Sequence, residues 1–186
     1  DVPGDQHEDR DQPHGLGDAN ATLQAVEEFL TEYEGTAVVD ADALQVVLEV
    51  ETDATLLCTP HQGELRKMGG ETHEDWRQRL VLVESFAADL DATLLVKGAY
   101  DVISDGETSR ANRTGNPGMT VGGTGDVLAG ISGSLASVLE PQHAAAIAAY
   151  VNGSAGDVVV EQRGHGLVAS DLLDAIPTVM RGDDDA

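Results

Sequence analysis

Short apolar segments occur between longer amphipathic segments along most of this 186-residue chain. The short segments do not alternate with polar residues, which is typical of strands buried on both faces of a sheet. We expect strands at 36–39, 54–58 and 93–96, and helices at 19–33, 72–88, 126–139, 141–160 and 171–180, the last capped by Ser170. This order predicts an α/β domain with a mainly parallel sheet flanked by helices.

One antiparallel hairpin is expected within this pattern. Residues 100–104 and 107–112 form two further strand-like segments, joined by Asp105 and Gly106. Asp-Gly between two such segments is typical of a two-residue type I′ turn. The hairpin is therefore expected near one edge of the sheet.

The composition excludes several classes of protein. Acidic residues number 34 and basic residues 10, giving a net charge of −24 and a sequence pI near 4.2. This charge argues against binding to nucleic acid or to an anionic membrane, and no apolar run approaches the ~18 residues of a membrane span. Cys58 is the single cysteine, which excludes an internal disulfide and a site with several thiolates. We expect Cys58 to be a small buried residue.

The acidic residues are spread along the whole chain. Aspartates number 20 and glutamates 14, while only two lysines, Lys67 and Lys97, accompany eight arginines. Repulsion among these charges destabilises a compact fold in dilute buffer, and salt screens it. The composition therefore indicates a protein of a high-salt cytoplasm, with an ordinary acidic protein as the alternative.

A glycine-rich segment, residues 115–133, runs directly into one of the expected helices. Glycines allow backbone N–H groups to point into a cavity without interference from a Cβ atom. Such a turn binds anions, because the first N–H groups of a helix lack intrahelical partners and the helix dipole is positive there. Asp126, at the helix start, is interpreted either as an N-cap or as a general base beside a phosphoryl group.

The sequence GNPGMTVGGTGDVLAG at 115–130 resembles the signature of the ADP- or ATP-dependent NAD(P)H-hydrate dehydratases, a family with the ribokinase-like fold. Four other segments are similar to motifs of that family and occur in the same order. They are VDADAL (39–44), TPHQGE (59–64), VKG (96–98) and GHGLVASDL (164–172). The G-x-G-D core alone would suit any ribokinase-like kinase, whereas the GNPGM leader and the TPH loop favour the dehydratases.

The resemblance implies a repair reaction on NADH or NADPH that has taken up water at the nicotinamide ring. The ring hydroxyl is phosphorylated from a nucleotide, and loss of phosphate restores the double bond. The resemblance implies ADP giving AMP, or else ATP, as the nucleotide, with Mg²⁺ bridging its phosphates. No dedicated metal site of the protein itself is expected.

The resemblance also implies roles for individual residues. Asp126 is expected to be the catalytic base, and the hydrated dinucleotide is expected to contact Gly17, His61 and Asp126. The nucleotide is expected to contact Lys97, Gly98, Ala99, Tyr100, Asp101 and Gly125. The backbone N–H groups expected to stabilise charge on the transferring oxygens belong to Gly123, Thr124 and Gly125.

Some of these residues also have purely structural interpretations. His61 could be a surface residue of a loop, and Glu64 could simply begin a helix. Lys97 could extend its charged end from a strand terminus into solvent, and Asp40 could be merely solvated. The helical spacing around Trp76 predicts a core position for this residue.

The resemblance covers residues 15–181, and roughly the first third of the family's domain is expected to be absent. Residues 1–14 are interpreted as a loop or truncation remnant, and residues 182–186 as an acidic tail. Two alternative functions stay open: a ribokinase-like kinase acting on a sugar or vitamin, and an inactive nucleotide-binding fragment. We expect a cytoplasmic homo-oligomer whose ligands are small molecules.

The charge predicts that stability depends on salt. Raising KCl from 0.1 to 2 M should raise the melting temperature strongly, because the Debye length falls from about 10 Å at 0.1 M to about 3 Å at 1 M. The measurement is thermal unfolding followed by circular dichroism across the salt series. An unchanged melting temperature would contradict adaptation to high salt.

Overall fold

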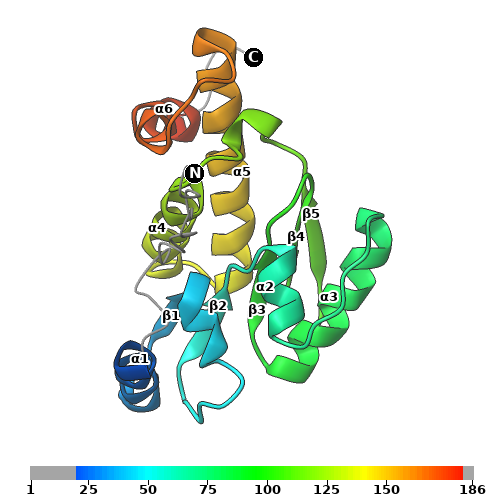
Figure 1. The fold of residues 1–186 in the computed structure, drawn as a ribbon, viewed down its shortest axis with the longest axis vertical. Helices are drawn as coiled ribbons and strands as arrows, with labels where there is room; N and C mark the ends of the chain where they lie inside the picture. Colours follow the sequence, from blue (N-terminus) through cyan, green and yellow to red (C-terminus); the bar gives the residue numbers. More distant parts are fainter. Residues whose placement is uncertain (1–19, 182–186) are drawn as a thin grey trace, which may run out of the picture.

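A computed structural model describes residues 20–181 (Figure 1). The predictions for residues 1–19, Gly17 among them, and for 182–186 lie outside these residues. The elements are α1 (Asn20–Glu32), β1 (Thr36–Val39), η1 (Ala41–Gln45), β2 (Thr55–Cys58), α2 (Gln62–Lys67), α3 (Trp76–Leu90), β3 (Thr93–Val96), β4 (Asp101–Ser104), β5 (Ser109–Asn112), η2 (Pro117–Met119), α4 (Thr124–Ala136), α5 (Pro141–Arg163) and α6 (Ala169–Arg181).

The five strands form one mixed sheet in the order β1-β2-β3-β4-β5. β1, β2 and β3 run parallel, and the pairs β3–β4 and β4–β5 are antiparallel. Val39 pairs with Cys58, and Cys58 pairs with Leu94, so the three parallel strands end at the same edge. The predicted α/β architecture, with a parallel part and an antiparallel hairpin, is confirmed.

Helices cover both faces of the sheet (Figure 1). On one face, α1, η1, α2 and α3 contribute to a core that includes Leu30, Leu65 and Val83. On the other face, α4 and α5 pack against Leu57 and Leu95 of the strands. Because both faces are covered, the parallel strands need apolar residues at nearly every position, and this explains their unbroken apolar sequences.

The 23-residue helix α5 contacts the sheet as well as the neighbouring helices α4 and α6. Its buried face is rich in alanine, including Ala144, Ala145, Ala148 and Ala149. Small side chains at a helix contact shorten the distance between the packed elements. Despite its length, neither α5 nor any other helix within residues 20–181 is apolar enough to cross a bilayer.

Cys58 is fully buried in β2, and its predicted place in the core is confirmed. Burial raises the pKa of its thiol to about 12, and the negative charge of Asp40 acts in the same direction. The thiol therefore stays protonated at neutral pH. Since the thiolate is the reactive form of cysteine, Cys58 is chemically inert in the folded chain.

Three helices begin at residues other than those that the sequence pattern predicts, and one of them is α4, which is expected from residue 126 but begins at Thr124. α3 is expected from residue 72 but begins at Trp76, because the Asp75 side chain caps it there. α6 begins at Ala169, so Ser170 lies inside the first turn and the prediction that it is the cap is wrong. The Asp171 carboxylate instead accepts the backbone N–H three residues earlier.

The predicted hairpin is present, but its two-residue type I′ turn is wrong. Ser104 pairs with Ser109, so residues 105–108 form a four-residue connection. The Asp105 carboxylate accepts hydrogen bonds from the two backbone N–H groups that follow Gly106, at 3.0 and 2.8 Å, and these bonds close the wider loop. Gly106 has φ of +87° whereas Asp105 has no positive φ, and a type I′ turn requires positive φ at both positions.

Gly106 and Gly69 offer a matched test of packing at the hairpin. Both have φ near +88°, but a Cβ on Gly106 would lie 2.6 Å from Ala88 Cα, whereas a Cβ on Gly69 would meet nothing within 4 Å. Gly69→Ala should lower the free energy of unfolding by about 1–2 kcal/mol from backbone strain alone. Gly106→Ala should cost roughly 1–3 kcal/mol more, because α3 must also shift. Urea unfolding measures both, and equal costs would contradict this packing.

Candidate functional site

The three parallel strands place polar side chains at one edge of the sheet. Asp40 directly follows β1, His61 lies three residues after β2, and Lys97 directly follows β3. The backbone pairing continues past the strands, since Lys97 N donates to Pro60 O at 2.9 Å and Lys97 forms a parallel bridge with His61. Open α/β folds bind their ligands at this carboxyl edge.

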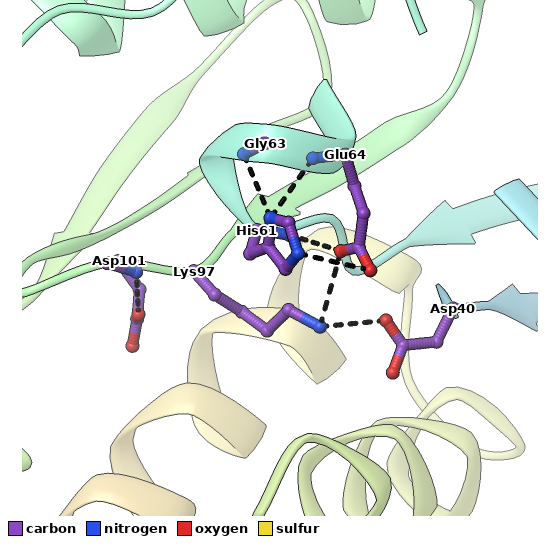
Figure 2. A network of polar contacts seen from close by, with 7 residues as sticks. Asp40, His61, Gly63, Glu64, Lys97 and Asp101 are labelled. Carbon is purple, nitrogen blue, oxygen red and sulfur yellow. Dashed lines mark hydrogen bonds and ion pairs between the residues drawn. The ribbon is translucent and has the colours of Figure 1, made fainter. Parts of the chain in front are cut away.

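The Lys97 ammonium is the central positive charge of this edge (Figure 2). Its Nζ lies 2.8 Å from Asp40 Oδ1 and 3.8 Å from Glu64 Oε2. Only 21% of the Lys97 side chain and 15% of the Asp40 side chain are exposed, so water screens this pair less than a surface pair. Neither a lysine extending freely into solvent nor a merely solvated aspartate describes this arrangement.

His61 and Glu64 form a capping box at the start of α2 (Figure 2). The Nδ1 atom of His61 accepts hydrogen bonds from the backbone N–H groups of Gly63 and Glu64, at 2.9 and 3.0 Å. The Glu64 carboxylate in turn accepts the backbone N–H of His61 at 2.7 Å. The expectation that Glu64 begins a helix is confirmed. The His61 ring is exposed and also has a structural role, which the sequence did not indicate.

Helix α4 begins beside the Lys97–Asp40 pair. A Cβ on Gly125 would lie 3.6 Å from Lys97 Nζ and 3.8 Å from Asp40 Oδ2. The N-cap is Gly123, with φ of +91°, and it offers no side chain to the first N–H groups, which stay available to an anion. Asp126 is the third residue of α4 and is exposed, so the N-cap interpretation of Asp126 is wrong.

The loop before α4 is held against α5 by contacts of Asp157 and Gly153, two residues to which the sequence pattern assigned no role. Asp157 accepts hydrogen bonds from the Gly115 N–H at 2.9 Å and from Asn116 Nδ2 at 2.8 Å. A Cβ on Gly153 would lie 2.3 Å from Thr114 Oγ1, so the loop contacts the α5 backbone directly. The available signal was two glycines and an aspartate within a segment otherwise typical of a buried helix.

Asp101 organises the turn that follows β3. Its carboxylate accepts hydrogen bonds from the Gly98 N–H and from Asn112 Nδ2, both at 3.0 Å. Burial raises the pKa of the Asp101 carboxyl, while these hydrogen bonds and the charges of Arg79 and Lys97 act in the opposite direction. The hydrogen bond from the Gly98 N–H to the Asp101 carboxylate therefore closes the turn.

Arg79 supports the same turn from α3. This residue is 3% exposed, and its guanidinium donates to Tyr100 O at 2.8 Å and to His73 O at 3.0 Å. The Tyr100 ring stacks on Trp76, with 5.5 Å between the ring centroids. Trp76 is partly exposed here, so the prediction of a core position is wrong. Helical spacing does not distinguish a core face from a face that packs against a loop.

A cavity of 740 Å³ lies among these elements, within the size range of small-molecule sites. The predicted site residues that line it are His61, Lys97, Gly98, Ala99, Asp101, Thr124 and Gly125. Residues 114–117 and 119–122 of the preceding loop, together with Leu128, Asn152 and Gly153, complete the wall. Tyr100, Gly123 and Asp126 are not among the lining residues.

Asp126 lies at a second cavity, of 460 Å³, between α4 and α6. The rest of its wall is mainly apolar and includes Ile131, Leu173 and Met180. The first turn of α4 therefore contributes to both cavities, with Gly125 at the first and Asp126 at the second.

No group of three or more His, Cys, Asp or Glu side chains within residues 20–181 is arranged to hold a metal ion. The carboxylates of Asp40 and Glu64 both face the Lys97 ammonium. Such a site suits Mg²⁺ only when the ion arrives with the phosphates of a nucleotide.

A family model described as NAD(P)H-hydrate dehydratase matches residues 14–178 of this chain. The bifunctional NAD(P)H-hydrate repair enzyme of Pyrobaculum aerophilum is 42% identical over 171 residues, and the match covers 90% of this chain and 34% of that protein. The enzyme with the same description from Methanothermobacter thermautotrophicus is 39% identical over 168 residues, covering 87% of this chain and 32% of its own length. The chain thus spans about a third of the curated relatives that it matches.

Solved structures show the same relationship. The ADP/ATP-dependent NAD(P)H-hydrate dehydratase of Bacillus subtilis, co-crystallised with ATP and Mg²⁺, superposes with a TM-score of 0.79 at 30% identity. The superposition covers 90% of this chain and 61% of that chain. A hydroxyethylthiazole kinase of Pyrococcus horikoshii shares the fold, with a TM-score of 0.67 at 21% identity, and covers 89% of this chain and 67% of the kinase. The predicted ribokinase-like fold and its partial extent are confirmed.

The geometry predicts that Asp40 is a stronger partner of Lys97 than Glu64 is, because its oxygen is 1 Å nearer (2.8 against 3.8 Å). Double-mutant cycles with Lys97→Met should give a coupling of about 1 kcal/mol or more for Asp40→Asn. The matched cycle with Glu64→Gln should give only a few tenths of a kcal/mol. Urea unfolding in constant salt measures both couplings, and a larger value for Glu64 would contradict the geometry.

Proposed function

The chain belongs to the NAD(P)H-hydrate dehydratase family, and we propose that it is the nucleotide-binding part of an enzyme that repairs hydrated NADH and NADPH. In this reaction, a phosphoryl group passes from ADP, or from ATP, to the hydroxyl of the hydrated ring. Phosphate then leaves with the former hydroxyl oxygen, the neighbouring ring carbon loses a proton, and the ring double bond returns. The observation that carries the proposal is the uncapped start of α4 beside Lys97, at the mouth of a cavity of suitable size.

The proposed nucleotide position follows from charge. Phosphates are anions, and the start of α4 combines free N–H groups with the positive end of the helix dipole. Lys97 adds a fixed positive charge within 4 Å of the Cβ position of Gly125. The turn from Gly98 to Asp101 lines the same cavity with Ala99 at its surface. Tyr100 supports the turn through its stack on Trp76 and is proposed to act on the nucleotide only indirectly.

Asp126 is the proposed general base. Its carboxylate is one residue from Gly125, so a phosphate held by the N–H groups of Gly123, Thr124 and Gly125 would lie close to it. A hydroxyl approaching Asp126 would give up its proton to the carboxylate as its oxygen bonds to the phosphorus, while the nucleotide keeps its remaining phosphates. Since Asp126 lines the second cavity, the reacting ring would approach from the α4–α6 side, and His61 would contact a more distant part of the dinucleotide.

Mg²⁺ is proposed to accompany the nucleotide. When bound, such an ion neutralises part of the charge that phosphoryl transfer develops on the phosphate oxygens. Lys97 and the N–H groups of α4 would hold the phosphates that carry it, and Asp40 supplies a carboxylate beside that position.

Two other functions were kept open by the sequence. A small-molecule kinase of this fold is disfavoured by the GNPGM and TPH motifs, and the likeness to hydroxyethylthiazole kinase, at 21% identity, concerns the fold alone. An inactive nucleotide-binding fragment is consistent with the short span of the chain, and only an activity measurement separates it from the enzyme. We further propose that the protein works as a homo-oligomer in a salt-rich cytoplasm, in keeping with its charge of −24.

Nucleotide binding gives the first test of the proposal. ADP or ATP with Mg²⁺, at about 100 times its Kd, should stabilise the folded chain by about 2.7 kcal/mol, seen as a rise in melting temperature in molar KCl. Lys97→Met should reduce this rise, whereas Lys67→Met, the same change at the only other lysine, should not. Absence of any rise with both nucleotides would contradict the proposed nucleotide site.

Turnover gives the second test. Hydrated NADH incubated with ADP or ATP should regain the absorbance of NADH. Asp126→Asn should lower the rate about 100-fold or more, because the amide cannot accept the hydroxyl proton, while the stabilisation by nucleotide persists. Asp174→Asn, which makes the same charge change at an exposed position of α6, is the matched control and should leave the rate unchanged. Near-normal turnover of Asp126→Asn would remove the assignment of the base.

A further inference from the structure

Asn152 of α5 is a buried polar residue for which neither the fold nor the proposed chemistry provides a partner. It lines the first cavity, and only 7% of its surface is exposed. Its Oδ1 atom has no hydrogen-bond partner among the described residues. A buried acceptor left unpaired is costly, so such groups usually meet water or a ligand.

The polar groups around this part of the cavity are already engaged with one another. The Thr114 hydroxyl lies 2.9 Å from Asn112 Oδ1 and 3.1 Å from Tyr150 O. The Asn112 amide donates to Asp101 at 3.0 Å and to Ala149 O at 3.2 Å. These bonds fix the wall beside Asn152, where its Oδ1 atom is a buried acceptor without a partner among the described residues.

The wall beside Asn152 differs in charge from the wall beside α4. Lys97 and the start of α4 form the part that suits phosphates, whereas Thr114, Gly115, Asn152 and Gly153 carry no charge. An uncharged part of a nucleotide therefore fits here better than its phosphates do. Thr114 occupies the space beside Gly153 and Met119 lies beside Gly115, so uncharged groups build this part of the wall.

The chemistry of the amide identifies the group that it would bind. A carboxamide offers one acceptor and one donor side by side, and it pairs with the amino group and the N7 atom of adenine through two hydrogen bonds. Hypoxanthine carries a carbonyl in place of the amino group, so it cannot donate to Oδ1.

We propose that Asn152 recognises the adenine base of the bound nucleotide through two hydrogen bonds. Its Oδ1 accepts from the adenine amino group, and its Nδ2 donates to N7. This inference rests on the proposed function, since it assumes that the first cavity holds the nucleotide. Asn152 thereby selects adenine over bases that lack the amino group at that position.

Titration calorimetry of ADP and IDP, each with Mg²⁺ in molar KCl, tests the assignment. The wild-type chain should bind ADP about tenfold or more tightly than IDP, as expected for one well-formed base contact. Asn152→Leu, similar in size but apolar, should lose this preference. The variant should bind ADP and IDP with about the same weak affinity. Ser132→Ala is the matched control, because Ser132 Oγ is also buried without a partner but does not line the cavity, and this variant should keep the wild-type preference.

The outcomes separate this inference from the function on which it rests. Equal binding of ADP and IDP by the wild-type chain overturns the role of Asn152 but leaves the nucleotide site in place, and this comparison needs no variant to fold. A wild-type preference that survives in Asn152→Leu, or in Asn152→Ala should the leucine variant unfold, also overturns it. Binding of neither nucleotide overturns both proposals.

Adenine is also part of the dinucleotide, so NADH and deamino-NADH form the second arm of the experiment. Asn152→Leu should change the ratio of ADP to IDP binding and leave the ratio of NADH to deamino-NADH binding unchanged. A change confined to the dinucleotide pair would place the adenine of the substrate at Asn152 and overturn the assignment to the nucleotide.

Discussion

The ion pair between Lys97 and Asp40 joins the ends of two parallel strands at the point where helix α4 begins. Every described residue of the proposed phosphate site is positioned relative to this pair, because β1 and β3 supply its two partners and Gly125 brings α4 against both. A chain with net charge −24 cannot attract an anion through its overall field. Attraction must therefore be local, and it comes from one lysine and from the N–H groups of a helix start.

The ion pairs of Lys97 also limit how strongly this lysine can attract an anion. Asp40 at 2.8 Å and Glu64 at 3.8 Å place two negative charges beside one positive charge. The cluster as a whole is negative, so a cation that accompanies the proposed phosphates would favour their binding. A nucleotide carried with Mg²⁺, in a medium rich in salt, suits such a site better than a bare anion in dilute buffer.

The loop before α4 has its own source of rigidity. Asp157 holds Gly115 and Asn116, and Gly153 lets Thr114 rest on the α5 backbone. α5 is buried against the sheet through alanines, so the loop is attached to the centre of the domain instead of to its surface. Backbone N–H groups that are held in place in this way can stabilise charge without rearranging during the reaction.

The sequence predicted the parts of this structure that follow from local pattern. Strands 36–39 and 93–96 match the observed strands, because residues buried on both faces leave an unbroken apolar signal. The order of the strands brought His61 and Lys97 to one edge, as parallel pairing requires. The glycine-rich segment indicated a turn that runs into α4, since positive φ at Gly123 favours glycine, but α4 begins at Thr124, two residues before the predicted start.

Local pattern failed where a side chain has a distant partner. The periodicity of α3 does not indicate that Arg79 is buried. The hydrogen-bond partners of Arg79, Tyr100 O and His73 O, lie outside the helix in a turn and a loop. The same holds for Asp157, whose partners lie about 40 residues earlier in the chain. The hairpin loop is a different case, because the partners of Asp105 are only two and three residues away: their hydrogen bonds to its carboxylate close a four-residue loop in place of the two-residue turn typical of Asp-Gly.

The first turn of α4 bears on which phosphoryl group can approach Asp126 in the proposed reaction. Successive residues of a helix point about 100° apart around its axis, so Gly125 and Asp126 face different cavities although they are adjacent in sequence. A nucleotide in the first cavity and a hydrated ring in the second would meet only across the end of this helix. The transferring phosphoryl group is then the one part of the nucleotide that Asp126 can approach. In this arrangement, phosphates closer to the nucleoside would lie in the first cavity, on the other side of the helix end from Asp126.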